Sequence, residues 1–167
     1  MTQAIRLAVV MDPIADCKFA KDSTLAMLLA AQKRGWELFY LEQSDLWLRD
    51  GVAMGRAAPL AVIANPKRWF ELGTAAATPL ASFDCVLMRK DPPFDTEYIY
   101  STYVLERAEL AGTLIVNRPQ GLRDINEKVF TAWFPECCAS TLICRNMADM
   151  AAFAREPAKV TRDPPVL

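Results

Sequence analysis

The stretch Ile5-Arg6-Leu7-Ala8-Val9-Val10-Met11-Asp12-Pro13 begins as a nearly continuous apolar run rich in branched residues, and its last two residues end that run. Such a run is typical of a strand that is covered by protein on both faces. After a loop, Asp22 or Ser23 can cap a helix, and residues 36–41 return as a strand. A strand-helix-strand unit crosses over right-handedly and brings its first loop to the carboxyl edge of the sheet, where ligands bind.

A second unit of the same kind is expected further along the chain. Residues 85–88 predict a strand, residues 96–111 a helix that ends at Gly112, and residues 113–117 another strand. The spacing of apolar residues predicts that this helix buries a face made of Ile99, Tyr103, Leu105, Leu110 and Ala111.

A β-hairpin is expected between the two units. Asp50-Gly51 suits a type I′ turn, in which both central residues need a positive φ, and residues 46–49 and 52–54 flank it. The fold class that follows is α/β, with a doubly wound, mainly parallel sheet and a β-hairpin insertion.

The other segments have less regular patterns. Residues 66–72 are expected to form a short helix, residues 124–133 a longer one, and residues 141–144 a strand. Asn146 can cap a last helix over residues 147–155.

The composition excludes several classes of protein. The net charge of -1 comes from 19 basic and 20 acidic side chains, so the chain has no field that would attract nucleic acid. No apolar run approaches the roughly 20 residues that span a bilayer, and residues 1–10 lack a signal-peptide pattern. We therefore expect a cytoplasmic protein with neither a nucleic-acid nor a membrane partner.

Cysteine and histidine usage limits the possible chemistry. The chain has no histidine, which excludes a Ser-His-Asp or Cys-His arrangement and most zinc sites. Its five cysteines lack a CxxC spacing and are expected to be reduced thiols, without a metal ligand among them.

Two loops carry the polar residues that could bind a ligand. Residues 11–14 follow the first expected strand, residues 88–95 follow the strand expected at residues 85–88, and prolines stiffen both loops. From such a loop, Arg89 and Lys90 can bind the carboxylate or phosphate of an anionic small molecule. The alternative is that both side chains only pair with Asp91 and Asp95 within their own loop.

An ordered series of segments then resembles the bacterial glutathione synthetases. The series spans approximately residues 5–153, in that family's order and spacing, which makes it far more specific than a lone motif. Its members are residues 10–15, 21–23, 26–29, 87–95 (LMRKDPPFD), 112–117, 126–128 (Asn-Glu-Lys) and 130–134.

The resemblance implies an ATP-dependent ligase that joins γ-glutamylcysteine to glycine through an acyl-phosphate. It also implies an ATP-grasp fold, a homotetramer, and ATP and magnesium as cofactors. Residues 1–118 correspond to the amino-terminal substrate-binding domain, which is pre-ATP-grasp and Rossmann-like. Residues 119–155 correspond to an incomplete start of the ATP-grasp domain.

The resemblance also assigns candidate site residues. Lys128 falls on a lysine that contacts the nucleotide phosphates, and the alternative is an exposed helix lysine. Asp12, Ser23 and Arg89 are candidates for binding the peptide substrate or glutathione, because Arg89 can fork onto a carboxylate and Ser23 lies at a helix start suited to anions. The alternatives are that Ser23 is only a helix cap and Asp12 only a turn former.

The resemblance stops after Phe153. The family's second phosphate-binding lysine, its glycine-rich loop and its magnesium-binding acids have no counterpart in this sequence, and residues 156–167 are expected to be a disordered tail. We therefore expect a truncated synthetase that retains at most a weak peptide-binding surface. The alternative is a noncatalytic interaction module that associates with a full-length synthetase. The missing GxGxxG and GxxxxGK[ST] patterns argue against a general nucleotide-binding domain.

We expect the 167-residue polypeptide by itself to have negligible glutathione synthetase activity. Acyl-phosphate formation needs positioned donors and magnesium to offset the charge on the transferring phosphoryl group, and Lys128 alone does not supply them. The measurement is phosphate release by the purified polypeptide with ATP. Release above background that depends on both γ-glutamylcysteine and glycine would contradict this expectation.

Overall fold

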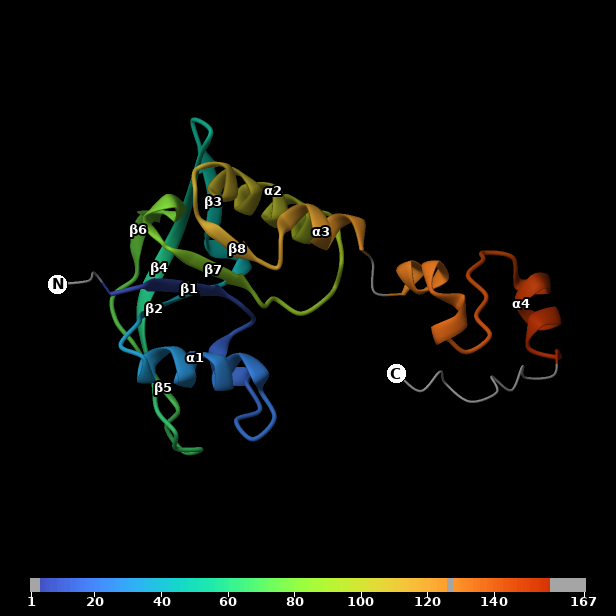
Figure 1. The fold of residues 1–167 in the computed structure, drawn as a ribbon, viewed down its shortest axis with the longest axis horizontal. Helices are drawn as coiled ribbons and strands as arrows, with labels where there is room; N and C mark the ends of the chain where they lie inside the picture. Colours follow the sequence, from blue (N-terminus) through green and yellow to red (C-terminus); the bar gives the residue numbers. More distant parts are fainter. Residues whose placement is uncertain (1–3, 126–127, 157–167) are drawn as a thin grey trace. The chain divides into compact units, whose positions relative to one another are not determined.

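A computed structural model describes residues 4–125 and 128–156 of the chain (Figure 1). The chain divides into two compact units between Arg123 and Asp124. We call residues 4–123 unit 1 and the described residues from Asp124 onward unit 2, and describe each by itself. Among the described residues, no helix has both the length and the apolar character that crossing a membrane requires.

Unit 1 is built around an eight-stranded sheet whose main path runs β3-β4-β2-β1-β7-β8. Four of these strands are parallel neighbours, namely β2 (Glu37–Leu41), β1 (Arg6–Val10), β7 (Cys85–Met88) and β8 (Leu114–Val116). The other four strands are β3 (Leu46–Arg49), β4 (Val52–Val62), β5 (Phe70–Leu72) and β6 (Ala76–Pro79). Among them β4 is central, because it pairs antiparallel with β3, β5 and β6 and also with β2. The α/β class is confirmed, but the sheet is mixed rather than mainly parallel because β4 runs against its neighbours.

Helices cover both faces of this sheet. α1 (Ser23–Lys33) lies on one side, whereas α2 (Thr96–Leu110) and α3 (Pro119–Asp124) lie on the other (Figure 1). Side chains of β1 alternate between the two layers: Leu7 and Val9 belong to the cluster that includes Leu28 of α1. Ala8 and Val10 belong to the opposite cluster with Leu105 of α2. β1 is the central strand of both cores, because its side chains enter each of them. Each large apolar side chain buried in this way contributes roughly 1.5–3 kcal/mol to the stability of the fold.

The expected hairpin is confirmed. Asp50 has a φ of 51° and Gly51 a φ of 79°, which is the pair of positive values that a type I′ turn requires. Its second strand, however, continues to Val62 and enters the main sheet.

Two expectations about unit 1 are wrong. Residues 66–72 are not a helix, because Phe70 pairs with Val62 and β5 adds to the sheet. The buried face of α2 is also different: of the five residues expected there only Leu105 is buried, while Leu110 is 72% and Tyr103 46% exposed. The helix instead buries Tyr98, Ser101, Thr102, Val104, Leu105 and Ala108.

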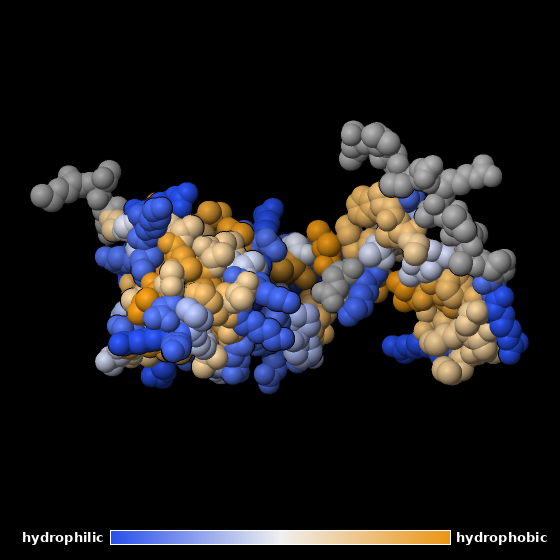
Figure 2. All heavy atoms as spheres, turned by 90° about the horizontal axis from the view of Figure 1, so that it is seen from below, coloured by the Kyte–Doolittle hydropathy of each residue, from blue (hydrophilic) through white to orange (hydrophobic). Residues whose placement is uncertain are grey.

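Unit 2 has short helices and no buried helical residue among those described. It contains two 3-10 helices, Val129–Trp133 and Pro135–Cys137, and α4 (Met147–Phe153). The Asn146 cap is confirmed, since its side chain accepts a hydrogen bond from the Ala148 N–H at 2.8 Å. Apolar side chains are correspondingly exposed, including Trp133 at 65% and Met147 at 74%. Figure 2 shows hydrophobic residues at the surface of this unit.

Two expectations about unit 2 are wrong over the described residues. α3 ends at Asp124 and residues 129–133 form a 3-10 helix, so no helix covers residues 124–133. Residues 141–144 carry no strand, because the described part of unit 2 offers them no pairing partner. Asn126 and Glu127 of the Asn-Glu-Lys motif, and residues 157–167 of the expected tail, lie outside the described residues.

We expect Gly55→Ala to destabilise unit 1 by about 1–3 kcal/mol, because overpacking a filled core costs this much. A Cβ at Gly55 would collide with the side chains of Leu41 and Leu80, which are both fully buried. Gly121→Ala is the matched control, since a Cβ at this position of α3 meets nothing within 4 Å. Urea unfolding measures both variants, and equal midpoints would contradict the proposed collision.

Candidate functional site

The register between β1 and β7 brings two loops together at one edge of the sheet. Val10 lies opposite Met88, and the Arg89 N–H donates to the Val10 carbonyl at 2.7 Å. The chain therefore leaves both strands side by side, and Asp12 comes close to Lys90. The expectation that the loops after these two strands meet at the carboxyl edge is confirmed.

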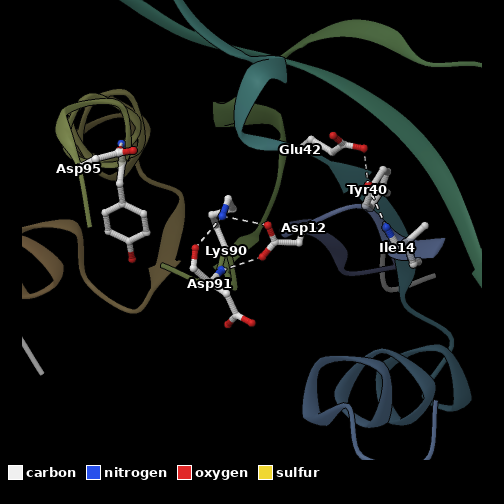
Figure 3. A network of polar contacts seen from close by, with 8 residues as sticks. Asp12, Ile14, Tyr40, Glu42, Lys90, Asp91 and Asp95 are labelled. Carbon is white, nitrogen blue, oxygen red and sulfur yellow. Dashed lines mark hydrogen bonds and ion pairs between the residues drawn. The ribbon is translucent and has the colours of Figure 1, made fainter. Parts of the chain in front are cut away.

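Asp12, Lys90 and Asp91 form a closed set of polar contacts (Figure 3). Lys90 Nζ lies 2.9 Å from Asp12 Oδ1 and donates to the Asp91 carbonyl at 2.6 Å. The Asp91 N–H donates to Asp12 Oδ2 at 2.9 Å. Burial by itself raises the pKa of the Asp12 carboxyl, but the hydrogen bonds from Lys90 and Asp91 and the charge of Lys90 outweigh it and lower that pKa. Through these contacts Asp12 links the loop after β7 to the loop after β1.

Arg89 extends toward the start of α1 instead of pairing within its own loop. Its Nε donates to Thr24 Oγ1 and its Nη2 to Ser23 Oγ, both at 3.0 Å. No carboxylate among the described residues lies within 4.0 Å of this guanidinium. Two neutral hydroxyls therefore hold Arg89, and its guanidinium has no ion-pair partner among the described residues.

The alternative in which Arg89 and Lys90 pair with Asp91 and Asp95 is wrong. Lys90 pairs with Asp12, and Asp95 accepts a hydrogen bond from the Tyr98 N–H at 2.9 Å, which caps α2. Figure 3 shows Asp95 at the end of that helix, apart from the Asp12–Lys90 pair.

A hollow of about 600 Å³, here called the Arg89 hollow, brings together Asp12, Ser23 and Arg89, the three candidates for binding the peptide substrate. Its lining includes Asp12, Lys18, Lys21, Ser23, Arg89 and Asp91. Asp22 also lines it, but this carboxylate caps α1 by accepting from the Leu25 N–H at 2.8 Å. Asp22 rather than Ser23 is thus the cap, which leaves the Ser23 hydroxyl facing Arg89. With Asp12 paired to Lys90, the basic side chains of Lys18, Lys21 and Arg89 face the carboxylates of Asp16, Asp22 and Asp91.

Cys17 also lines the Arg89 hollow. Burial, and then the nearby carboxylates of Asp22, Asp12 and Asp16, raise the pKa of its thiol to about 12. This sulfur is therefore protonated at neutral pH.

A second hollow of about 480 Å³ shares Met11, Asp12 and Pro13 with the Arg89 hollow, and we call it the Glu42 hollow. Glu42, Gln43 and Ser44 line it from the loop after β2, and Glu97, Tyr100 and Ser101 from α2. No motif in the sequence pointed to this hollow, although the loop after β2 leaves the same sheet edge as the loop after β1.

Tyr40 orients Glu42 at the wall of the Glu42 hollow. Its hydroxyl donates to Glu42 Oε1 at 2.8 Å and accepts from the Ile14 N–H at 3.1 Å (Figure 3). Burial, together with the hydrogen bond to Glu42, raises the pKa of the Tyr40 hydroxyl, so it remains a donor. One carboxylate oxygen of Glu42 is thereby fixed.

Lys128, the phosphate-side candidate, belongs to unit 2 rather than to the two hollows. It is exposed and precedes the 3-10 helix Val129–Trp133, where its carbonyl accepts from the Thr131 hydroxyl at 2.5 Å. Within residues 4–125 and 128–156, no group of three or more Asp, Glu, Cys or His side chains could hold a metal ion. We therefore derive no step through a bound magnesium ion.

Comparison with known proteins gives a consistent set of matches. Residues 5–123 match the family model for the N-terminal domain of prokaryotic glutathione synthetase. The chain is 55% identical over 161 residues to a glutathione synthetase of Pseudomonas putida, a match that covers 96% of this chain and 51% of that protein. It is 58% identical over 149 residues to a glutathione synthetase of Shewanella oneidensis and 57% identical over 149 residues to one of Escherichia coli O6:H1; each match covers 89% of this chain and 47% of the relative. The chain spans about half the length of the curated relatives it matches.

We expect the stabilising effect of Asp12 to depend on pH. Because its pKa is lowered in the folded chain, the ionised form stabilises the fold above the ordinary pKa of 3.8, and this contribution is lost as the pH falls through the folded pKa. Asp12→Asn should therefore unfold at a lower urea concentration than the parent at about pH 6, with the difference shrinking toward about pH 3.

Asp16→Asn is the matched control for that measurement. Asp16 is an exposed carboxylate on the same loop, with no ion pair among the described residues. A difference between Asp12→Asn and the parent that stays constant with pH would show that the charge of Asp12 has no part in holding the loops.

Proposed function

The chain belongs to the prokaryotic glutathione synthetase family, and from that premise we propose that unit 1 forms the peptide-binding side of a glutathione synthase-like site. The reaction concerned is the ATP-dependent joining of γ-glutamylcysteine to glycine. The proposed ligands are γ-glutamylcysteine or the product glutathione, which both carry carboxylates.

The observation that supports this proposal is that Arg89 has no ion-pair partner among the described residues. A guanidinium held by the hydroxyls of Ser23 and Thr24 keeps further N–H groups for a ligand carboxylate. Its position is fixed before binding, which lowers the ordering cost of taking up a ligand. The N-terminal turn of α1 adds a favourable dipole at the same wall of the Arg89 hollow.

The three substrate-side candidates take different roles in this proposal. Arg89 contacts the ligand carboxylate, and Ser23 orients Arg89 while its own proton remains available to the ligand. Both oxygens of Asp12 already accept hydrogen bonds from Lys90 and Asp91. Asp12 is therefore a positioning residue that holds the loop carrying Arg89.

The chemical step is not assigned to unit 1. The family implies ATP and magnesium for the whole enzyme, and Lys128 is the described residue that we propose for the phosphate side. We propose no catalytic residue within residues 4–125. The role proposed for unit 1 is to bind and orient the peptide.

A noncatalytic interaction module is the second candidate function. The exposed apolar side chains of unit 2 favour it, including Trp133, which stacks on Phe130 with ring centroids 5.1 Å apart and remains 65% exposed. An interaction module would pair with a full-length synthetase through such a surface and would not need Arg89. The two functions therefore differ in whether Arg89 matters for binding.

We expect calorimetry to detect binding of γ-glutamylcysteine to the purified chain, and Arg89→Met to weaken it by about tenfold or more, because a charge-assisted hydrogen bond is lost. Arg56→Met is the matched control, since Arg56 is exposed on β4 and lines neither hollow. Thermal unfolding of both variants checks that they fold. Absence of heat from the parent at millimolar ligand, or equal affinity of Arg89→Met, would contradict the proposed function.

A further inference from the structure

We propose that the Glu42 hollow is a second subsite, which binds the ammonium group of the same ligand whose carboxylate binds at Arg89. This inference rests on the proposed function. It adds a separate group of residues, from the loop after β2 and from α2, to the recognition of the ligand.

The two hollows are neighbours. Both are lined by Met11, Asp12 and Pro13, so they meet at the loop after β1. Asp12 lines both hollows, and its partner Lys90, whose side chain is only 17% exposed, lines the Glu42 hollow. A ligand that crosses this loop can place one end in each hollow.

The hollows differ in charge. In the Glu42 hollow the charges of Asp12 and Lys90 cancel, which leaves the carboxylates of Glu42 and Glu97. In the Arg89 hollow the basic and acidic side chains balance, but the Arg89 guanidinium is held next to the start of α1 without an ion-pair partner among the described residues. The Glu42 hollow therefore favours a positive group, the Arg89 guanidinium can bind a negative one, and γ-glutamylcysteine carries both.

The lining of the Glu42 hollow suits an ammonium group better than a metal ion. Its carboxylates do not form a group of three that could hold a metal among the described residues. An ammonium group needs up to three acceptors, which Glu42, Gln43 and the hydroxyls of Ser44 and Ser101 can supply. Met11, Leu46 and Val104 add apolar wall for the methylene groups of an aliphatic ligand.

We expect Glu42 to account for most of the preference of this hollow for an ammonium group. The Tyr40 hydroxyl holds one of its carboxylate oxygens at 2.8 Å, so the group is oriented before a ligand arrives. A glutamine at this position can still accept from Tyr40 and differs mainly in the lost charge. Glu42→Gln therefore tests the charge without removing the contact that positions the side chain.

The experiment compares γ-glutamylcysteine with N-glutarylcysteine, the same molecule with its amino group replaced by hydrogen, by calorimetry on the full chain. We expect the parent to bind N-glutarylcysteine about tenfold more weakly, and Glu42→Gln to lose about tenfold for γ-glutamylcysteine while binding N-glutarylcysteine as the parent does. Glu71→Gln is the matched control, because Glu71 is exposed on β5 and lines neither hollow.

The outcomes separate this inference from the proposed function. Equal affinity of the parent for the two ligands would overturn the ammonium subsite and leave the binding function in place. An equal loss for both ligands in Glu42→Gln would also overturn it, because a general structural effect would then explain the variant. Absence of any heat with γ-glutamylcysteine would overturn both proposals.

Discussion

The parallel pairing of β1 with β7 is the constraint on which the rest of unit 1 depends. Its register sets Val10 opposite Met88, so the residues that follow both strands must leave the sheet together. Because β1 is buried on both faces, the strand cannot slip by one residue without turning its core side chains to the wrong layer. The position of the Asp12–Lys90 pair, and with it the lining that the two hollows share, follows from that register.

The features that could be predicted from the sequence are those with local signals. β1 is an apolar run ended by Asp12-Pro13, and the hairpin depends on two adjacent residues, Asp50 and Gly51. The cap at Asn146 is equally local. The meeting of the two loops was also predictable, since it follows from parallel strands and right-handed crossovers rather than from side-chain detail.

The features that could not be predicted depend on distant partners. β5 exists because Phe70 finds Val62 on β4, a strand that was expected to end before it reached the main sheet. α2 has apolar or aromatic side chains on several sides, including Tyr98, Tyr100 and Leu110, so periodicity could not select the face that meets the sheet. The Glu42 hollow needed the placement of α2 against the loop after β2, for which the sequence offers no short-range signal.

Cys17 gives the Arg89 hollow a chemical property of its own. A thiol with a pKa of about 12 is almost entirely protonated in neutral solution, and the thiolate is the form that attacks a disulfide. The peptide proposed for this hollow itself carries a thiol, and its oxidised form is a disulfide. Burial, and then the carboxylates of Asp22, Asp12 and Asp16, therefore make the neighbouring sulfur slow to capture such a ligand covalently, which would keep binding of the proposed peptide reversible.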